Sequence, residues 1–195
     1  MVGRPREFDP EIVLDAAMQA FWAKGYEATS LSDLMAATGL HKGSLYQAFG
    51  DKHTLFVQAL KRYLSDMRRM KNEVVARAST PLDGIQAITH GMLDIADDDC
   101  NCPRGCLAIN TLVELAPHDE EVQDVLNDHM QRMRKAFAEV VALAQEAGQI
   151  RTDRTPEEIT ALMMTFMLGL GTNLRGHLNK DDAHKLLDAQ FDAVI

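Results

Sequence analysis

Cysteine, proline and glycine are scarce in this chain, and long apolar runs are missing. Among 195 residues there are 12 glycines, 6 prolines and 3 cysteines. An odd and low cysteine count argues against a disulfide framework. No apolar run approaches the roughly 18 residues that a membrane-spanning helix needs, and the N-terminus lacks the apolar stretch of a signal peptide. We therefore expect a cytoplasmic protein that does not contact a membrane.

Basic residues are also outnumbered, with 20 Lys and Arg against 29 Asp and Glu and a formal net charge of -9. A partner as acidic as nucleic acid would be repelled by that charge if it were spread evenly. It is not even, because residues 1–70 hold nine basic and eight acidic groups. The excess acid therefore lies in the C-terminal part, which leaves room for a basic face near the N-terminus.

Apolar residues recur with helical period in nearly every segment, and no segment reads convincingly as a strand. Capping signals separate the helices: Asp9-Pro10 begins the first and Gly25 ends it, while Ser30 and Asp33 form the pattern of a capping box. The expected fold class is all-α, with about nine helices. With their caps they span residues 9–25, 30–39, 42–49, 51–78, 80–95, 107–116, 119–148, 155–170 and 181–194.

The second and third of these helices are short and joined by a tight turn at Gly39. Two such helices are typical of a helix-turn-helix. Apolar side chains within residues 31–49 can pack on the first helix, namely Leu34, Leu40, Leu45 and Phe49. The third helix then presents a small and polar N-terminal end, which a recognition helix needs in order to reach base edges in the major groove.

The same stretch resembles the tetracycline-repressor (TetR) family. The matching string is Phe21-x-x-x-Gly25-Tyr26-x-x-Thr29-Ser30, followed by Thr38-Gly39-Leu40-x-Lys42-Gly43-x-Leu45-Tyr46-x-x-Phe49-x-x-Lys52-x-x-Leu55. The resemblance implies a three-helix DNA-binding head, residues 1–56, and a body that binds a ligand and dimerises, residues 57–195. It further implies a homodimer on double-stranded operator DNA, and usually repression relieved by a small-molecule effector.

Candidate DNA contacts follow from this assignment. Base edges are expected to meet the start of the recognition helix and one position a turn later, namely His41, Lys42, Gly43, Ser44 and Gln47. The resemblance implies phosphate contacts by Tyr46 and Lys52. Thr29 and Ser30 can place hydroxyls against phosphate or serve only as caps. Arg4 and Arg6 form a basic arm that can enter the minor groove or remain a simple tail.

The body is less informative. Gly105-Cys106-Leu107-x-x-Asn110-x-x-x-Glu114-Leu115-Ala116-Pro117 looks like a motif of one broad TetR subgroup. Methionine adapts to varied apolar shapes, so the candidate ligand pocket is lined by Met92, Met130, Met133, Met163 and Met167, although each of them also suits ordinary core. The candidate polar anchors are His90, His129 and His177.

Three thiols, Cys100, Cys102 and Cys106, lie within seven residues. A helix N-terminus near Cys106 would favour a reactive thiolate, whereas Asp97, Asp98 and Asp99 would oppose it. A thiol-based redox or electrophile sensor is therefore an alternative to a small-molecule sensor. The spacing matches no standard zinc motif, so no metal is expected.

The last two helices carry a further apolar excess, which predicts a two-fold dimer interface. Its expected members are Phe166, Leu170, Leu187, Phe191 and Val194, with Gly169 and Gly171 allowing close approach. No phosphate loop or nucleophile–base–acid set is present, so the chain is expected to be neither an enzyme nor a cofactor binder. A helical adaptor without DNA binding and a thiol enzyme are the alternatives from other classes.

Overall fold

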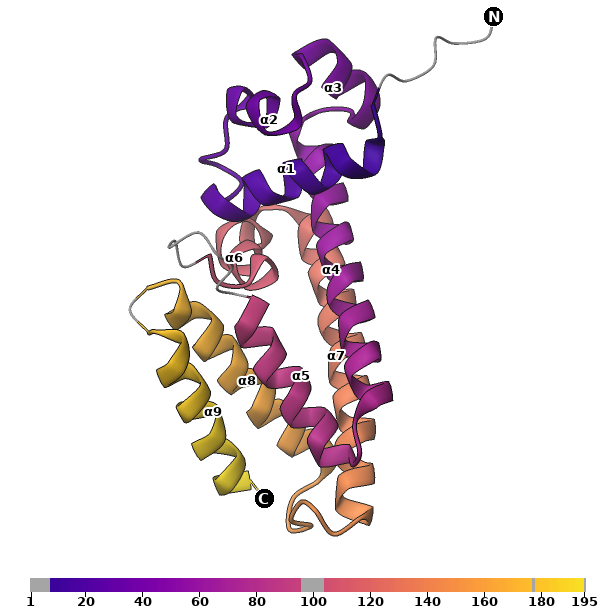
Figure 1. Cartoon of the computed structure of the whole chain (residues 1–195), viewed down its shortest axis with the longest axis vertical. Coiled ribbons are helices and arrows are strands. Elements are labelled where there is room, and N and C mark those ends of the chain that lie inside the picture. Colours follow the sequence, from indigo (N-terminus) through magenta and orange to yellow (C-terminus); the bar gives the residue numbers. More distant parts are fainter. Residues whose placement is uncertain (1–7, 96–103, 177, 195) are drawn as a thin grey trace, which may run out of the picture. The chain divides into compact units, whose positions relative to one another are not determined.

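The computed structural model describes residues 8–95, 104–176 and 178–194. Over these ranges it contains nine α-helices, a short 3-10 helix and no strand, which confirms the all-α prediction (Figure 1). The chain divides into two compact units, Met1–Ser65 and Asp66–Ile195. Among the described residues, no helix has both the length and the hydropathy to span a bilayer.

The first unit, which we call the head, consists of three helices and the beginning of a fourth. These are α1 (Pro10–Lys24), α2 (Leu31–Thr38), α3 (Lys42–Phe49) and α4 (Lys52–Arg77). Asp9 caps α1 by accepting a hydrogen bond from the backbone N–H of Glu11 at 2.9 Å. Gly39 ends α2 in the left-handed conformation, with φ of 69°. A side chain is strained there, so glycine permits the turn into α3.

Aromatic rings form the core of the head. Phe21 of α1 meets Phe56 of α4 edge to face, with centroids 5.0 Å apart, and Tyr26 meets the same Phe56 ring at 4.9 Å. Leu34 and Leu45 of the predicted packing set are fully buried, as expected. Ile12 of α1 is apolar but 68% exposed, so it lies outside this core.

The second unit, the body, contains the remaining part of α4 and five further α-helices. They are α5 (Pro81–Ile95), α6 (Leu107–Glu114), α7 (Glu120–Glu146), α8 (Pro156–Leu174) and α9 (Lys180–Val194), with the 3-10 helix η1 (Ala116–His118) before α7. Within the body, α7 packs against both α5 and α8, and α9 packs against α5 and α8 (Figure 1). One apolar core runs between α5, α7, α8 and α9.

The subgroup motif builds the start of α6. Gly105 has a φ of 61°, and an added Cβ would lie 3.2 Å from the carbonyl oxygen of Gly171. The buried Asn110 amide donates to the carbonyl of Arg104 at 2.8 Å. The motif thus shapes the turn that lays α6 against α8.

Three residues predicted at the dimer interface lie elsewhere. Leu170, Leu187 and Phe191 are at most 5% exposed, because they belong to the body's own core. Gly171 also faces inward, since a Cβ there would meet Cδ1 of Ile109 in α6 at 2.4 Å. These predictions are corrected: the close approach at Gly171 serves packing between α6 and α8 within one chain. The side chain of Val194 lies outside the described residues.

Candidate nucleic-acid interface

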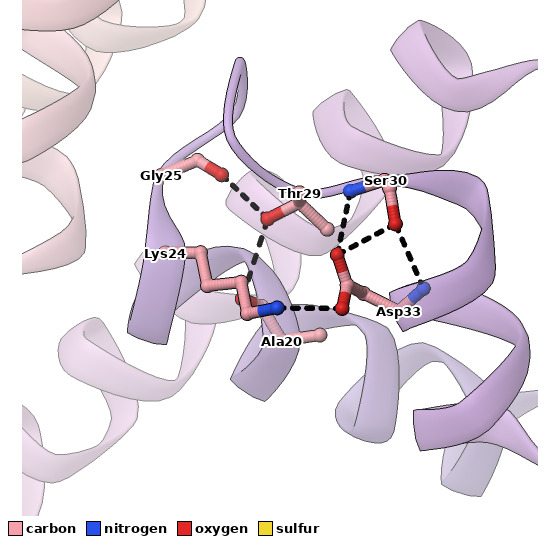
Figure 2. Close-up of polar contacts among 6 residues, drawn as sticks. All are labelled: Ala20, Lys24, Gly25, Thr29, Ser30 and Asp33. Carbon is pink, nitrogen blue, oxygen red and sulfur yellow. Dashed lines mark hydrogen bonds and ion pairs between the residues drawn. The ribbon is translucent and has the colours of Figure 1, made fainter.

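Polar contacts join the end of α1 to the start of α2 (Figure 2). The Ser30 hydroxyl accepts a hydrogen bond from the backbone N–H of Asp33 at 3.1 Å, and the Asp33 carboxylate accepts one from the backbone N–H of Ser30 at 2.8 Å. The predicted capping box is therefore confirmed, with Asp in the position usually held by Glu.

The Asp33 carboxylate also joins the two helices. Lys24, at the end of α1, places its Nζ 2.5 Å from Asp33 Oδ1. Hydrogen bonds from Lys24, and then from the hydroxyl and backbone N–H of Ser30, hold the pKa of Asp33 well below its usual range. The carboxylate therefore stays ionised at neutral pH, and the junction keeps its charge-assisted bonds.

Thr29 has a different place from the one proposed for a phosphate contact. Its side chain is fully buried, and its hydroxyl donates to the carbonyl of Gly25 at 2.5 Å, with the carbonyl of Ala20 3.4 Å away (Figure 2). A hydroxyl in the interior that is bonded to the last turn of α1 is not available to DNA. We therefore correct the prediction for Thr29, whose role is to satisfy helix-end carbonyls. Ser30 is exposed.

The recognition helix α3 presents its N-terminal end to solvent. His41 is the N-cap residue and makes no capping hydrogen bond through its side chain. The exposed residues are His41, Lys42, Gly43, Ser44 and Gln47. A Cβ added to Gly43 would meet nothing within 4 Å, so packing inside the head does not require glycine at this position. The opposite face of α3 is anchored by Leu45 and Phe49.

The two expected phosphate ligands each take part in a contact between a lysine ammonium and an aromatic ring. Tyr46 is half-buried, and the Nζ of Lys42 lies 5.8 Å from its ring centroid. Lys52 lies with its Nζ 4.5 Å from the ring centroid of Tyr26 and 3.5 Å from the carbonyl oxygen of Glu27. Both side chains remain partly exposed to solvent. Arg4 and Arg6 lie outside the described residues.

In the body, four of the five predicted pocket methionines belong to, or pack against, the apolar core between α5, α7, α8 and α9. Met163 is buried in it, and Met92, Met133 and Met167 pack against it while partly buried. Met130 is half-buried on α7. Burial, followed by the cations Arg68 and Lys71, lowers the pKa of His129. His177 lies outside the described residues.

Of the three cysteines, only Cys106 is described. It is the half-buried N-cap residue of α6, and its side chain makes no capping hydrogen bond. Cys100 and Cys102 lie outside the described residues, so thiol sensing stays a prediction. Within the described part of the chain, no group of three or more His, Cys, Asp or Glu residues could hold a metal ion.

A capped short helix, a left-handed glycine turn and an exposed, polar second helix define a helix-turn-helix DNA-binding protein. Comparison with known proteins identifies the family. The profile "Bacterial regulatory proteins, tetR family" matches residues 13–59, and "Tetracyclin repressor-like, C-terminal domain" matches residues 81–189. The chain therefore belongs to the TetR family of transcriptional regulators.

Individual relatives agree with this assignment. The transcriptional repressor ComR of Escherichia coli (strain K12) is 32% identical over 179 residues, covering 89% of this chain and 82% of ComR. The uncharacterized regulator YezE of Bacillus subtilis (strain 168) is 32% identical over 167 residues, 83% of this chain and 81% of YezE. A solved structure of a CifR cysteine mutant, complexed with 26bp double-strand operator DNA, has 28% identity and a TM-score of 0.85, covering 99% of this chain and 100% of CifR.

The capping box yields a stability prediction. Replacing Ser30 with alanine removes the acceptor for the Asp33 N–H, so the free energy of unfolding should fall by about 1 kcal/mol in urea titrations. Ser32→Ala, at an exposed neighbouring position, should change it by less than about 0.5 kcal/mol. Equal losses in the two variants would show that the cap contributes nothing specific.

A substitution at Gly43 should affect protein stability and operator affinity in different ways. Because its surroundings are open, Gly43→Ala should keep or raise thermal stability, by up to about 1 kcal/mol, since alanine favours helix. From the expected base contact at Gly43, operator affinity should nevertheless fall, because a methyl group would then stand between the α3 backbone and the base edges. Calorimetric unfolding and a gel-shift titration on the same preparation measure the two effects. Unchanged affinity would place Gly43 away from the DNA.

Proposed function

We propose that the protein is a cytoplasmic, dimeric repressor that binds a two-fold operator through α3 and is released by a small-molecule effector bound in the body. The observation that supports this DNA-binding surface is the N-terminal end of α3, where His41, Lys42, Gly43, Ser44 and Gln47 are exposed to solvent. The structure of the CifR mutant with operator DNA supports the same use of this head.

We assign the contacts on the head by chemistry. Lys42, Ser44 and Gln47 carry donors or acceptors suited to base edges, and Gly43 allows the backbone to come close. Tyr46 and Lys52 supply a phenol hydroxyl and an ammonium for phosphate, and exposed Ser30 adds a hydroxyl at the start of α2.

The dimer surface is proposed on the outward faces of α8 and α9. Between these helices lies a hollow of about 670 Å³, lined by Arg151, Arg154, Glu158, Ala161, Leu162, Thr165, Phe166, Gln190 and Ala193. Leu162 and Leu186 are 46% and 45% exposed on α8 and α9. An exposed apolar surface of this kind is expected to be covered by the same surface of a second copy. Phe166 of the original prediction remains part of this interface.

The effector site is proposed at the methionine-lined core between α5, α7, α8 and α9. Flexible, polarizable thioethers can reshape around an apolar ligand. Helix α4 contributes residues to both units, so it is the covalent route by which a ligand can alter the spacing of the two heads. Operator half-sites require a fixed spacing, and a coupling of about 1–3 kcal/mol is enough to change occupancy.

Two lysine variants test the DNA assignment on double-stranded DNA taken from upstream of the gene. Lys42→Ala should cost about 1–3 kcal/mol and relax the preference at particular base pairs. Lys52→Ala should weaken binding to all sequences and reduce the salt dependence by about one counterion. Tyr46→Phe, which keeps the ring and removes only the hydroxyl, should also weaken binding to all sequences but leave the salt dependence unchanged, because a neutral hydroxyl displaces no counterion. Uniform, sequence-independent losses from both lysine variants would refute the division of roles.

The dimer proposal predicts a difference between two equally apolar surface sites. Leu162→Glu places a charge in the proposed interface and should give a monomer at micromolar concentration in sedimentation equilibrium. Leu143→Glu, at a 53% exposed position on α7, should leave the dimer intact. A wild-type monomer, or a Leu162→Glu variant that remains a dimer, would contradict this placement.

A further inference from the structure

Two histidines that are 94 positions apart in the chain meet where α5 packs against α9. The Nδ1 atoms of His90 and His184 are 2.6 Å apart. Their rings are almost parallel, at 5°, with centroids 4.9 Å apart. A separation of 2.6 Å between two ring nitrogens requires a proton between them, because two bare lone pairs or two N–H groups would repel each other.

The outer nitrogen of each ring faces a carboxylate. His90 Nε2 lies 3.0 Å from Asp188 Oδ1, and His184 Nε2 lies 3.2 Å from Asp94 Oδ1. The Nζ of Lys180 is 3.0 Å from the same Asp94 oxygen. The contacts form an unbroken chain from Asp94 through His184 and His90 to Asp188.

The other neighbours of the histidine pair are one aromatic ring and a few charged groups. Phe191 of α9 stacks on His90 with centroids 6.5 Å apart. Partial burial alone would raise the pKa of Asp94, but hydrogen bonds from Lys180 and His184 outweigh it and lower that pKa. Asp94 is therefore an anion at neutral pH. Among the described residues, the charged groups that contact the two rings are Asp94 from α5 and Asp188 from α9.

The hydrogen bonds between Asp94, His184, His90 and Asp188 fix how many protons the four ring nitrogens must carry. Both outer nitrogens must carry N–H to donate to carboxylates, and the inner contact needs one N–H facing one lone pair. That makes three protons on four nitrogens, one more than two neutral imidazoles carry. With two protons, one of the three contacts loses its hydrogen. With four protons, two N–H groups face each other at 2.6 Å.

We propose that His90 and His184 together bind one extra proton, and that this shared proton fastens α9 to α5. The singly protonated pair carries one positive charge. This charge and that of Lys180 equal the two negative charges of Asp94 and Asp188. The cluster of two histidines, one lysine and two aspartates therefore has no net charge in this protonation state alone. The contact between α5 and α9 is therefore most stabilising over a limited pH range, and its contribution decreases at both lower and higher pH. This inference concerns the body alone and does not depend on the proposed DNA contacts.

The pH dependence of stability tests the proposal in the full chain. His90→Gln and His184→Gln keep a polar side chain but cannot hold the shared proton. The loss in melting temperature relative to wild type should be greatest, about 2–4 °C, near pH 6.5, where an imidazole ordinarily titrates. It should shrink toward about pH 5 and about pH 8.5, as the wild-type pair becomes doubly protonated or neutral. The exposed His118 provides a control: His118→Gln should lack this maximum.

Nitrogen NMR of 15N-histidine-labelled wild type gives a readout that does not depend on how variants fold. Near pH 6.5 one ring of the pair should carry protons on both nitrogens while the other carries one. Two neutral rings or two doubly protonated rings at that pH would overturn the proposal. So would a loss of melting temperature that is independent of pH. A rise in the wild-type melting temperature with equimolar zinc chloride, absent in His184→Gln and reversed by EDTA, would assign the pair to a metal ion and also overturn it.

Discussion

A single carboxylate in the first turn of α2, that of Asp33, ties α1 to α2 in the DNA-binding head. Asp33 accepts hydrogen bonds from Lys24 in α1 and from the backbone and side chain of Ser30. Beside it, the buried Thr29 hydroxyl closes the last turn of α1 through the carbonyl of Gly25. The direction of α2 is thereby tied to that of α1. Since α3 follows after only a left-handed glycine turn, the recognition helix takes its direction from the same junction.

The helices and the capping box could be predicted because their signals are local. A cap, a proline at the first helical position and a glycine at the end act within a few residues of one another. Asp9, Ser30, Asp33 and Gly39 all behave as their positions in the chain predict. The polar start of α3 is equally local, because exposure follows once Leu45 and Phe49 are known to face inward.

Other features depend on partners that are distant in sequence. An apolar stripe has the same period whether it faces its own core or a second chain, so Leu187 and Phe191 could not be assigned from periodicity. A threonine beside a cap looks alike whether it is buried or exposed, which explains the error at Thr29. The contact between His90 and His184 joins two helices through tertiary packing alone. The local sequence around either histidine therefore does not predict its contact with the other.

The exposed end of α3 has a consequence for how such a protein diversifies. His41, Lys42, Ser44 and Gln47 point away from the hydrophobic interior, while Leu45 and Phe49 hold the helix in place from the other side. Mutations at the outward positions are therefore nearly invisible to selection for folding. Because we propose that these positions contact the operator, we expect a duplicated copy of the gene to acquire a new target sequence without passing through unfolded intermediates. Under that proposal, substitutions at these few positions would redirect the protein to a chosen promoter while leaving its fold unchanged.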